Sequence, residues 1–207
     1  MRMFSLRSGL CSSVSLGIFL IGSLSAQEVS PFTFSIGGGF TQPVGNTGRQ
    51  LDDGWNIQGG AGMNFGKYLG VMVDLGYNSF GINTLTVNNA GATGGSLHVF
   101  SATLDPIVHL TPHSRFDIYV TGGGGIFHRT QEFSQPGTST AIGIDPFFGI
   151  GPVTSSYSVN KPGIDVGAGI AFGTKWHGKV FAEAKYDRIY TNYRHTDYLP
   201  VTFGFRW

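Results

Sequence analysis

The sequence YLPVTFGFRW, residues 198–207, gives the clearest indication of how this chain folds. Its apolar residues fall at every second position: Leu199, Val201, Phe203, Phe205 and Trp207. The positions between them hold Pro200, Thr202, Gly204 and Arg206. A period of two is that of a β-strand, so one face of this strand is apolar and ends in an aromatic ring. In water such a face would be an aggregation hazard, whereas in the wall of a barrel embedded in lipid it matches its solvent.

Seven earlier segments show the same alternation. They span residues 32–41, 55–65, 69–78, 100–109, 116–126, 164–172 and 180–187. In all eight segments the apolar face contains no Asp, Glu, Lys or Arg, although a basic side chain at the bilayer midplane would cost roughly 2–4 kcal/mol. The charged residues all fall on the other face: Asp74, Asp105, Asp117, Asp165, Glu183, Lys185, Asp187 and Arg206. The pattern predicts apolar side chains toward lipid and polar ones toward the lumen, the inverse of a soluble barrel.

The connections between these segments alternate in length. Residues 44–54, 79–96 and 129–163 form long connections, residues 66–68, 111–114 and 173–179 form short ones, and residues 191–197 form a medium one. This alternation is expected when one set of turns faces the periplasm and the other faces outside, and an even strand number then places both termini on the periplasmic side. Aromatic residues such as Trp55, Tyr77 and Tyr190 are expected near the outer interface. Because proline lacks a ladder donor, Pro106 and Pro200 predict a bulge or a strand end.

Residues 1–26 have the features of an export signal. Arg2 and Arg7 precede the apolar run GIFLIGSL, and the small residues Ser25 and Ala26 follow it, so cleavage is expected after one of these two. An N-terminal membrane anchor is the alternative, but it needs about 20 apolar residues. The predicted barrel domain is then residues 27–207. The single cysteine, Cys11, lies in the signal, so the exported domain would have neither disulfide nor thiol chemistry.

The composition excludes some partners. The formal net charge is +1 and charged residues make up 12% of the chain, which gives no electrostatic argument for nucleic acid. The 33 glycines and 14% aromatic residues are consistent with curved, closely packed strands.

The stretches VFAEAKYDRIYT (180–191) and PVTFGFRW (200–207), together with the alternation before them, resemble the outer-membrane β-barrel domain family, the small OmpA/OmpX-type eight-stranded barrels. The resemblance implies an all-β transmembrane antiparallel up-and-down β-barrel in the bacterial outer membrane. Ten strands are the alternative if residues 129–163 add a hairpin. The resemblance also implies a monomer whose partners are outer-membrane lipid and lipopolysaccharide. The terminal strand is similar to the signal that the barrel assembly machinery reads, carried by Leu199, Val201, Phe203, Phe205 and Trp207.

The lumen of an eight-stranded barrel is just wide enough for its own side chains, which argues against a general diffusion porin and leaves a narrow passive channel as an alternative. Glu183, Lys185 and Arg206 share the inward face on adjacent strands. We expect Glu183 and Arg206 to form a buried ion pair that plugs the lumen. The alternative is that lumen water solvates each of them separately.

Some barrels of this size hydrolyse or transfer acyl chains of lipid A, so an enzyme is a second alternative. The nearest candidates are His195 and Asp197, with Thr191 or Thr196 as a hydroxyl donor. Lipid A deacylases of this type carry a His-x-Ser-Asn motif, which His195-Thr196-Asp197 does not reproduce. The remaining histidines lack metal-ligand spacing: His98, His109, His113, His128 and His177. We therefore expect no catalysis, no cofactor and no metal.

The connection at residues 129–163 is the segment left to carry a surface role. Connections longer than about 12–15 residues are usually functional or disordered. Its apolar residues Ile144, Phe147 and Phe148 are expected to contact a partner or a surface glycolipid. The alternative is that part of it extends the barrel as a hairpin above the membrane. The predicted function is a structural or surface-interaction, adhesin-like role through the extracellular loops.

Overall fold

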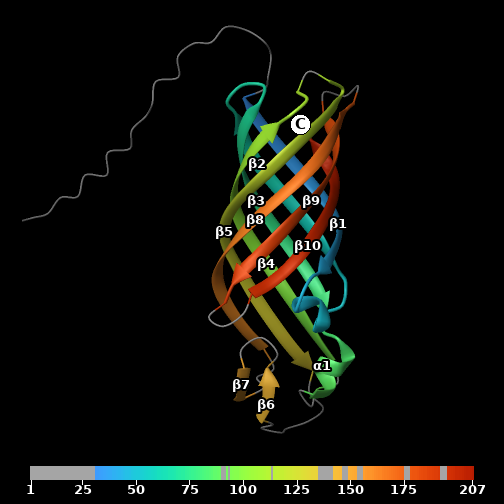
Figure 1. The fold of residues 1–207 in the computed structure, drawn as a ribbon, viewed down its shortest axis with the longest axis vertical. Coiled ribbons are helices and arrows are strands. Elements are labelled where there is room, and N and C mark those ends of the chain that lie inside the picture. The colour runs from blue at the N-terminus through green and yellow to red at the C-terminus, as the bar shows by residue number, and fades with distance from the viewer. Residues whose placement is uncertain are drawn as a thin grey trace, which may run out of the picture.

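Eight antiparallel strands close into a barrel in the order β1-β10-β9-β8-β5-β4-β3-β2 (Figure 1). The structure is a computed structural model and describes residues 31–89, 92, 94–112, 114–134, 142–145, 149–152, 156–174, 178–191 and 195–207. The barrel strands are β1 Phe32–Pro43, β2 Gly54–Asn64, β3 Leu69–Gly81, β4 Gly94–His109, β5 Phe116–Ser134, β8 Ser156–Gly173, β9 Lys179–Tyr190 and β10 His195–Arg206. The predicted eight-stranded up-and-down barrel is confirmed.

The ten-stranded alternative is wrong. The strands β6 (Ile142–Asp145) and β7 (Gly149–Pro152) pair only with each other, as a separate two-stranded sheet. They cannot enter the barrel wall because β5 and β8 already pair directly, from Phe116↔Phe172 to Glu132↔Ser156. Part of the connection at residues 129–163 therefore extends the barrel as a hairpin, which was the alternative considered for this segment.

The terminal strand closes the barrel. β10 pairs with β1 from Ser35↔Arg206 to Pro43↔Tyr198. Beyond this ladder, Phe34 N donates to Trp207 O at 2.9 Å, and Trp207 N donates to Phe34 O at 3.0 Å. Closure leaves no sheet edge within the barrel, which is the condition for β-strands to cross lipid.

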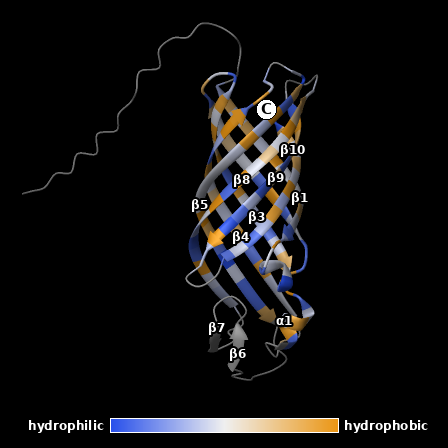
Figure 2. Cartoon of the chain, in the orientation of Figure 1, coloured by the Kyte–Doolittle hydropathy of each residue, from blue (hydrophilic) through white to orange (hydrophobic). Residues whose placement is uncertain are grey.

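The predicted alternation of faces is confirmed in the middle of the barrel. The outward residues Val73, Leu104 and Val166 are 49%, 54% and 60% exposed, whereas Asp74 and Asp105 point inward and are buried. Figure 2 shows hydrophobic and hydrophilic residues alternating along these strands. The exposed apolar band is the surface that hydrocarbon covers.

The interior is not polar along its whole length, and here the prediction of a polar lumen is corrected. An inner apolar cluster lies toward the end of the barrel where β1 begins and β10 ends: Met72, Ile107, Tyr119, Ala171 and Phe181. A larger outer apolar cluster fills the other end: Leu51, Phe80, Ile82, Val87, Ala92, Leu97, Val99, Phe127, Phe133, Ile189 and Tyr198. The outer cluster lies where the wall rises out of lipid into water. There the outward face meets water, so apolar side chains are favoured on the inward face instead.

The prolines mark no bulge, contrary to expectation. Pro106 keeps its pair with Val71, and the β4–β5 register is the same on both sides of it. Pro200 likewise keeps its pair with Thr41, and the β9–β10 register is unchanged from Tyr198↔Asp187 to Val201↔Ala184. Each residue in a ladder directs its single N–H to one neighbour, so each proline interrupts pairing on one side only.

The two ends of the barrel differ as the loop lengths predicted. The short turns and the C-terminus lie at one end, and the helix α1 (Thr84–Asn89) and the β6–β7 hairpin lie at the other (Figure 1). The 3-10 helix η1 (Thr47–Arg49) sits in the β1–β2 connection. Among the described residues, none of the helices has the length and apolarity needed to cross a membrane. The export signal at residues 1–26 lies outside the described residues and stays a prediction.

Candidate functional site

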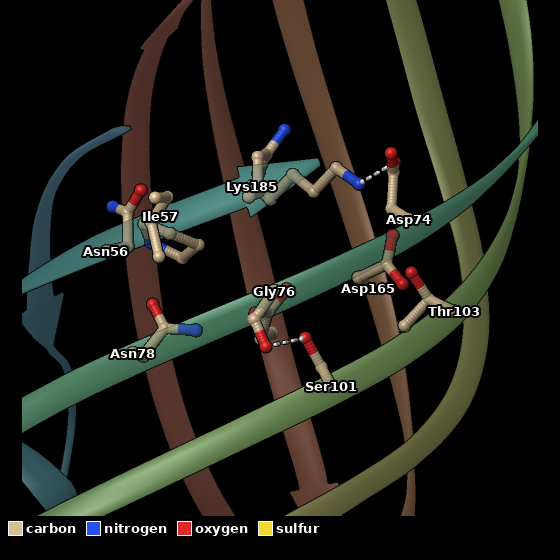
Figure 3. A pocket seen from close by; sticks show the side chains of 12 residues that line it. Asn56, Ile57, Asp74, Gly76, Asn78, Ser101, Thr103, Asp165 and Lys185 are labelled. Carbon is tan, nitrogen blue, oxygen red and sulfur yellow. Dashed lines mark hydrogen bonds and ion pairs between the residues drawn. The ribbon is translucent and has the colours of Figure 1, made fainter. Parts of the chain in front are cut away.

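Lys185 forms the centre of a buried ion network in the lumen. From β9 its side chain reaches across the barrel to β3 and β4, where Nζ lies 2.9 Å from Asp74 Oδ2 and 2.6 Å from Asp105 Oδ2. Glu183 Oε1 lies 3.9 Å from the same nitrogen. Figure 3 shows the bond from Lys185 to Asp74. One ammonium group thus links three strands through charge-assisted contacts.

Arg206 lies nearer the inner end, between two aromatic rings. Its guanidinium carbon is 4.6 Å from the Tyr119 ring centroid and 5.1 Å from that of Phe181, within cation–π range. Arg206 Nη2 lies 3.8 Å from Glu183 Oε2. The three residues expected in the lumen, Glu183, Lys185 and Arg206, are therefore brought together. That the Glu183–Arg206 pair plugs the lumen stays a proposal.

The sequence did not indicate the partners of Lys185. The inward parity of Asp74 and Asp105 was visible, but parity does not reveal which strands face each other across the lumen. That depends on the tilt and stagger of the strands in the closed barrel. The aromatic rings that flank Arg206 were missed for the same reason.

Asp165 is a buried carboxylate without a hydrogen-bond partner among the described residues. It is 5% exposed, and neither of its oxygen atoms accepts a hydrogen bond. It lines a small cavity of about 30 Å³ together with Asn78, Ser101, Thr103 and Lys185 (Figure 3). A water molecule needs about 10–15 Å³ of such volume, so the cavity has room for roughly two waters.

A second ion group lies at the inner end. Asp117 is fully buried, and its Oδ2 lies 2.7 Å from His109 Nδ1 and 3.0 Å from Lys179 Nζ. Lys179 is half-exposed at the mouth of the lumen, whereas Lys185 is enclosed. The two lysines therefore form a natural pair for comparison.

The residues weighed as a catalytic group are not assembled as one. Asp197 accepts two bonds from Arg188, at 2.9 Å from Nε and 3.1 Å from Nη2, so its carboxylate does not orient His195. The His195 ring instead packs edge-on against Tyr190 at 5.8 Å. Thr196 is buried on the opposite face of β10. Hydrogen bonds to Asp197 raise the pKa of Arg188 above its usual range. The geometry gives no support for acyl-ester hydrolysis at His195.

On the outward face above the apolar band, polar side chains bond one another. Tyr77 Oη lies 3.0 Å from His98 Nδ1, and the Tyr77 ring also packs against that of Trp55 at 5.5 Å. His128 Nδ1 lies 2.6 Å from Asn160 Oδ1. Rings with polar tips are typical of the level where lipid meets water.

Of the three residues predicted to contact a partner, the structure describes Ile144. Ile144 lies in β6, opposite Ile150 of β7. Phe147 and Phe148 lie outside the described residues. Contact between these three residues and a partner stays a prediction.

In the described part of the chain, no group of three or more His, Cys, Asp or Glu side chains is placed to hold a metal ion. His113 and His177 lie outside that part. A ligand set made of such side chains alone is therefore not found among the described residues.

The sequence profile of the outer membrane protein beta-barrel domain matches residues 14–206. The chain belongs to this family. The predicted membership and the location in the bacterial outer membrane are both confirmed. As a member of the outer membrane β-barrel domain family, the chain places its exposed apolar band in the lipid bilayer.

Solved structures of other outer-membrane barrels share the fold. Neisserial surface protein A matches with a TM-score of 0.60 at 13% identity, over 86% of this chain and 96% of its own. A major outer membrane protein from Thermus thermophilus matches with a TM-score of 0.56 at 13% identity, over 85% and 97%. Ail, the attachment invasion locus protein of Yersinia pestis, matches with a TM-score of 0.52 at 18% identity, over 85% and 97%. No curated protein sequence matches the chain. Identities this low show the fold alone.

Proposed function

We propose that this outer-membrane barrel is a closed anchor that presents a β-sheet for protein contact at the cell surface, an adhesin-like role. The observation that carries the proposal is a wall of β4, β5 and β8 that rises beyond the rest of the barrel. β5 has 19 residues and β8 has 18, against 11 or 12 in β1, β2, β9 and β10. Within this extension, we use the name outer wall for residues 127–134 of β5 and 156–162 of β8.

The outer wall offers one strand edge. β8 pairs with β5 as far as Ser156, whereas its pairing with β9 stops at Gly163↔Ile189. Within the described ranges, no strand lies against the other side of β8 over residues 156–162. A strand edge without a neighbouring strand is a template to which an extended segment of another protein can add through main-chain hydrogen bonds.

The outer wall is rigid enough to serve as a platform. Phe127 and Phe133 are buried on its inner side, within the outer apolar cluster. On its outward side, Thr130 Oγ1 lies 2.9 Å from Ser158 Oγ. Apolar packing behind and polar groups in front are what a water-exposed binding sheet requires. The attachment role in the name of Ail, which shares this fold, is consistent with the proposal.

Shortening the outer wall is expected to abolish surface binding while leaving the barrel intact. The variant replaces residues 131–157 with an Asn-Gly turn, which closes a hairpin at the Thr130↔Ser158 pair. Binding of the purified barrel in lipid nanodiscs to cultured cells and to immobilised extracellular proteins should fall at least tenfold. Retention of the folded barrel is checked by its heat-dependent shift in gel mobility.

The matched control deletes Thr138–Val153 and so keeps every pair up to Glu132↔Ser156. It should bind like the wild type. If the control also loses binding, the contact belongs to the loop with Ile144, Phe147 and Phe148, which both variants lack. If both variants bind normally, the proposed role of the outer wall is wrong.

We also infer that the barrel is not a passive channel. The outer apolar cluster fills one end of the lumen, and the Tyr119–Arg206–Phe181 stack lies at the other. Apolar side chains without space for water do not conduct ions. In planar lipid bilayers the wild-type protein should give no steady conductance steps. Reproducible ohmic steps would contradict this inference.

We also propose how the chain is exported and assembled. The signal at residues 1–26 is removed after Ser25 or Ala26, the barrel is a monomer, and its terminal strand is read by the assembly machinery. The terminal strand also has a structural role, since Trp207 bonds to Phe34 where the barrel closes.

A further inference from the structure

The middle of the lumen holds more carboxylates than cations. The buried carboxylates are Asp74, Asp105, Asp165, Glu183 and Asp187, and the buried cations are Arg129, Lys185 and Arg206. With all of these groups ionised, the carboxylates exceed the cations. Enclosed charge that is not balanced is strongly destabilising, so a further positive species is required.

The deficit is concentrated at Asp165. Asp74 and Asp105 each accept a bond from Lys185, but both oxygen atoms of Asp165 lack a partner among the described residues. The residues on either side, Ile164 and Val166, face the lipid, so hydration cannot come through the wall. The open side of Asp165 is the cavity that it lines, so a balancing charge can be held there.

The cavity supplies neutral oxygen donors beside this carboxylate. The hydroxyl groups of Ser101 and Thr103 and the amide groups of Asn56 and Asn78 line it (Figure 3). Carboxylate, hydroxyl and amide oxygen atoms are the ligands that hard cations prefer. The chemistry of the lining therefore matches the missing charge.

We propose that this cavity binds a single small monovalent metal cation of the Na⁺ class, with Asp165 as its charged ligand. Neutral oxygen atoms of Ser101 and Thr103, with one or two waters, complete its surroundings. The site lies between the inner and outer apolar clusters, so exchange with bulk solvent requires side-chain movement.

A divalent ion fits less well. Ca²⁺ takes 6–8 oxygen ligands, and Mg²⁺ keeps several of its waters. The described residues offer no cluster of three chelating side chains, and a cavity of about 30 Å³ has no room for a large hydration shell. The Lys185 ammonium group, already among these carboxylates, repels a double charge more than a single one.

The test compares unfolding of the barrel by urea in lipid vesicles, in NaCl and in choline chloride of equal ionic strength at neutral pH. Choline is too large for the cavity. A ligand at ten times its Kd multiplies the folded-to-unfolded ratio by about eleven, so NaCl should raise this ratio about tenfold over choline. Asp165→Asn should remove the Na⁺ effect and fold at least as well in choline, because it deletes an unbalanced buried charge. Asp117→Asn, at the inner ion group, should keep the Na⁺ effect.

Equal stability of the wild type in Na⁺ and choline would overturn the proposal, as would an Na⁺ effect that survives Asp165→Asn. Stabilisation by acid in choline without any Na⁺ effect would mean that protons balance the charge instead. A larger effect of MgCl₂ or CaCl₂ at equal ionic strength would exclude a monovalent site. If Asp165→Asn does not fold, Ser101→Ala takes its place and should weaken Na⁺ binding severalfold. ²³Na relaxation on the wild type reports the site directly.

Discussion

Lys185→Met is expected to lower the free energy of unfolding by about 3–5 kcal/mol, because removing one partner of a buried ion group leaves the others uncompensated. Lys185 Nζ lies within 3 Å of carboxylate oxygens of both Asp74 and Asp105. Methionine keeps the length and apolar stem of the side chain but not its charge. The loss therefore reports the stranded carboxylates rather than a cavity.

Lys179→Met is the matched control on the same strand. Lys179 bonds one carboxylate, Asp117, and its side chain is 39% exposed, so water replaces the lost contact. Its effect should stay below about 1 kcal/mol, as for exposed ion pairs. Urea unfolding in lipid vesicles, followed by tryptophan fluorescence, measures both variants. Equal losses in the two would show that the lumen of the barrel is hydrated at Lys185.

Gly125→Ala is expected to destabilise the barrel by about 3 kcal/mol or more, at the upper end of overpacking effects. A Cβ atom at Gly125 would collide with the backbone oxygen of Ala102 on β4, and it would lie 2.7 Å from Thr103 Cα. Both obstacles are backbone atoms of a paired strand, so no rotamer change relieves them. The glycine is required by the close approach of two strands.

Gly122→Ala, in the same run of glycines, supplies the comparison. Its Cβ would lie 3.3 Å from the nearest atom, the backbone oxygen of Asp165, and would face the lipid side. We expect a loss of about 1 kcal/mol or less. Refolding yield into vesicles and urea midpoints measure both variants. If the two alanines behave alike, close approach at Gly125 is not what limits the fold.

Alternation by itself was enough to predict the strands of the membrane-spanning wall and which side of each faces lipid. The sequence around Asp74 shows why, since Val73 and Leu75 flank it and any shift of one residue would place a carboxylate in hydrocarbon. Local sequence thus determines which face of the sheet a side chain lies on, wherever a shift of one residue would place a charge in lipid. The two prolines were misread because a ladder tolerates the loss of one donor on one side.

Which side chains meet inside the barrel could not be predicted from the sequence. Lys185 contacts residues 80 and 111 positions away in the sequence, and Arg206 lies against a ring 87 positions away. Strand tilt and barrel closure determine which of these residues meet in space, and the alternation of residues along a strand does not reveal either of them. The outer apolar cluster was missed for a related reason. A period of two is the same whether the apolar side faces lipid or a core, so the reversal at the water boundary requires knowing where along each strand the membrane ends.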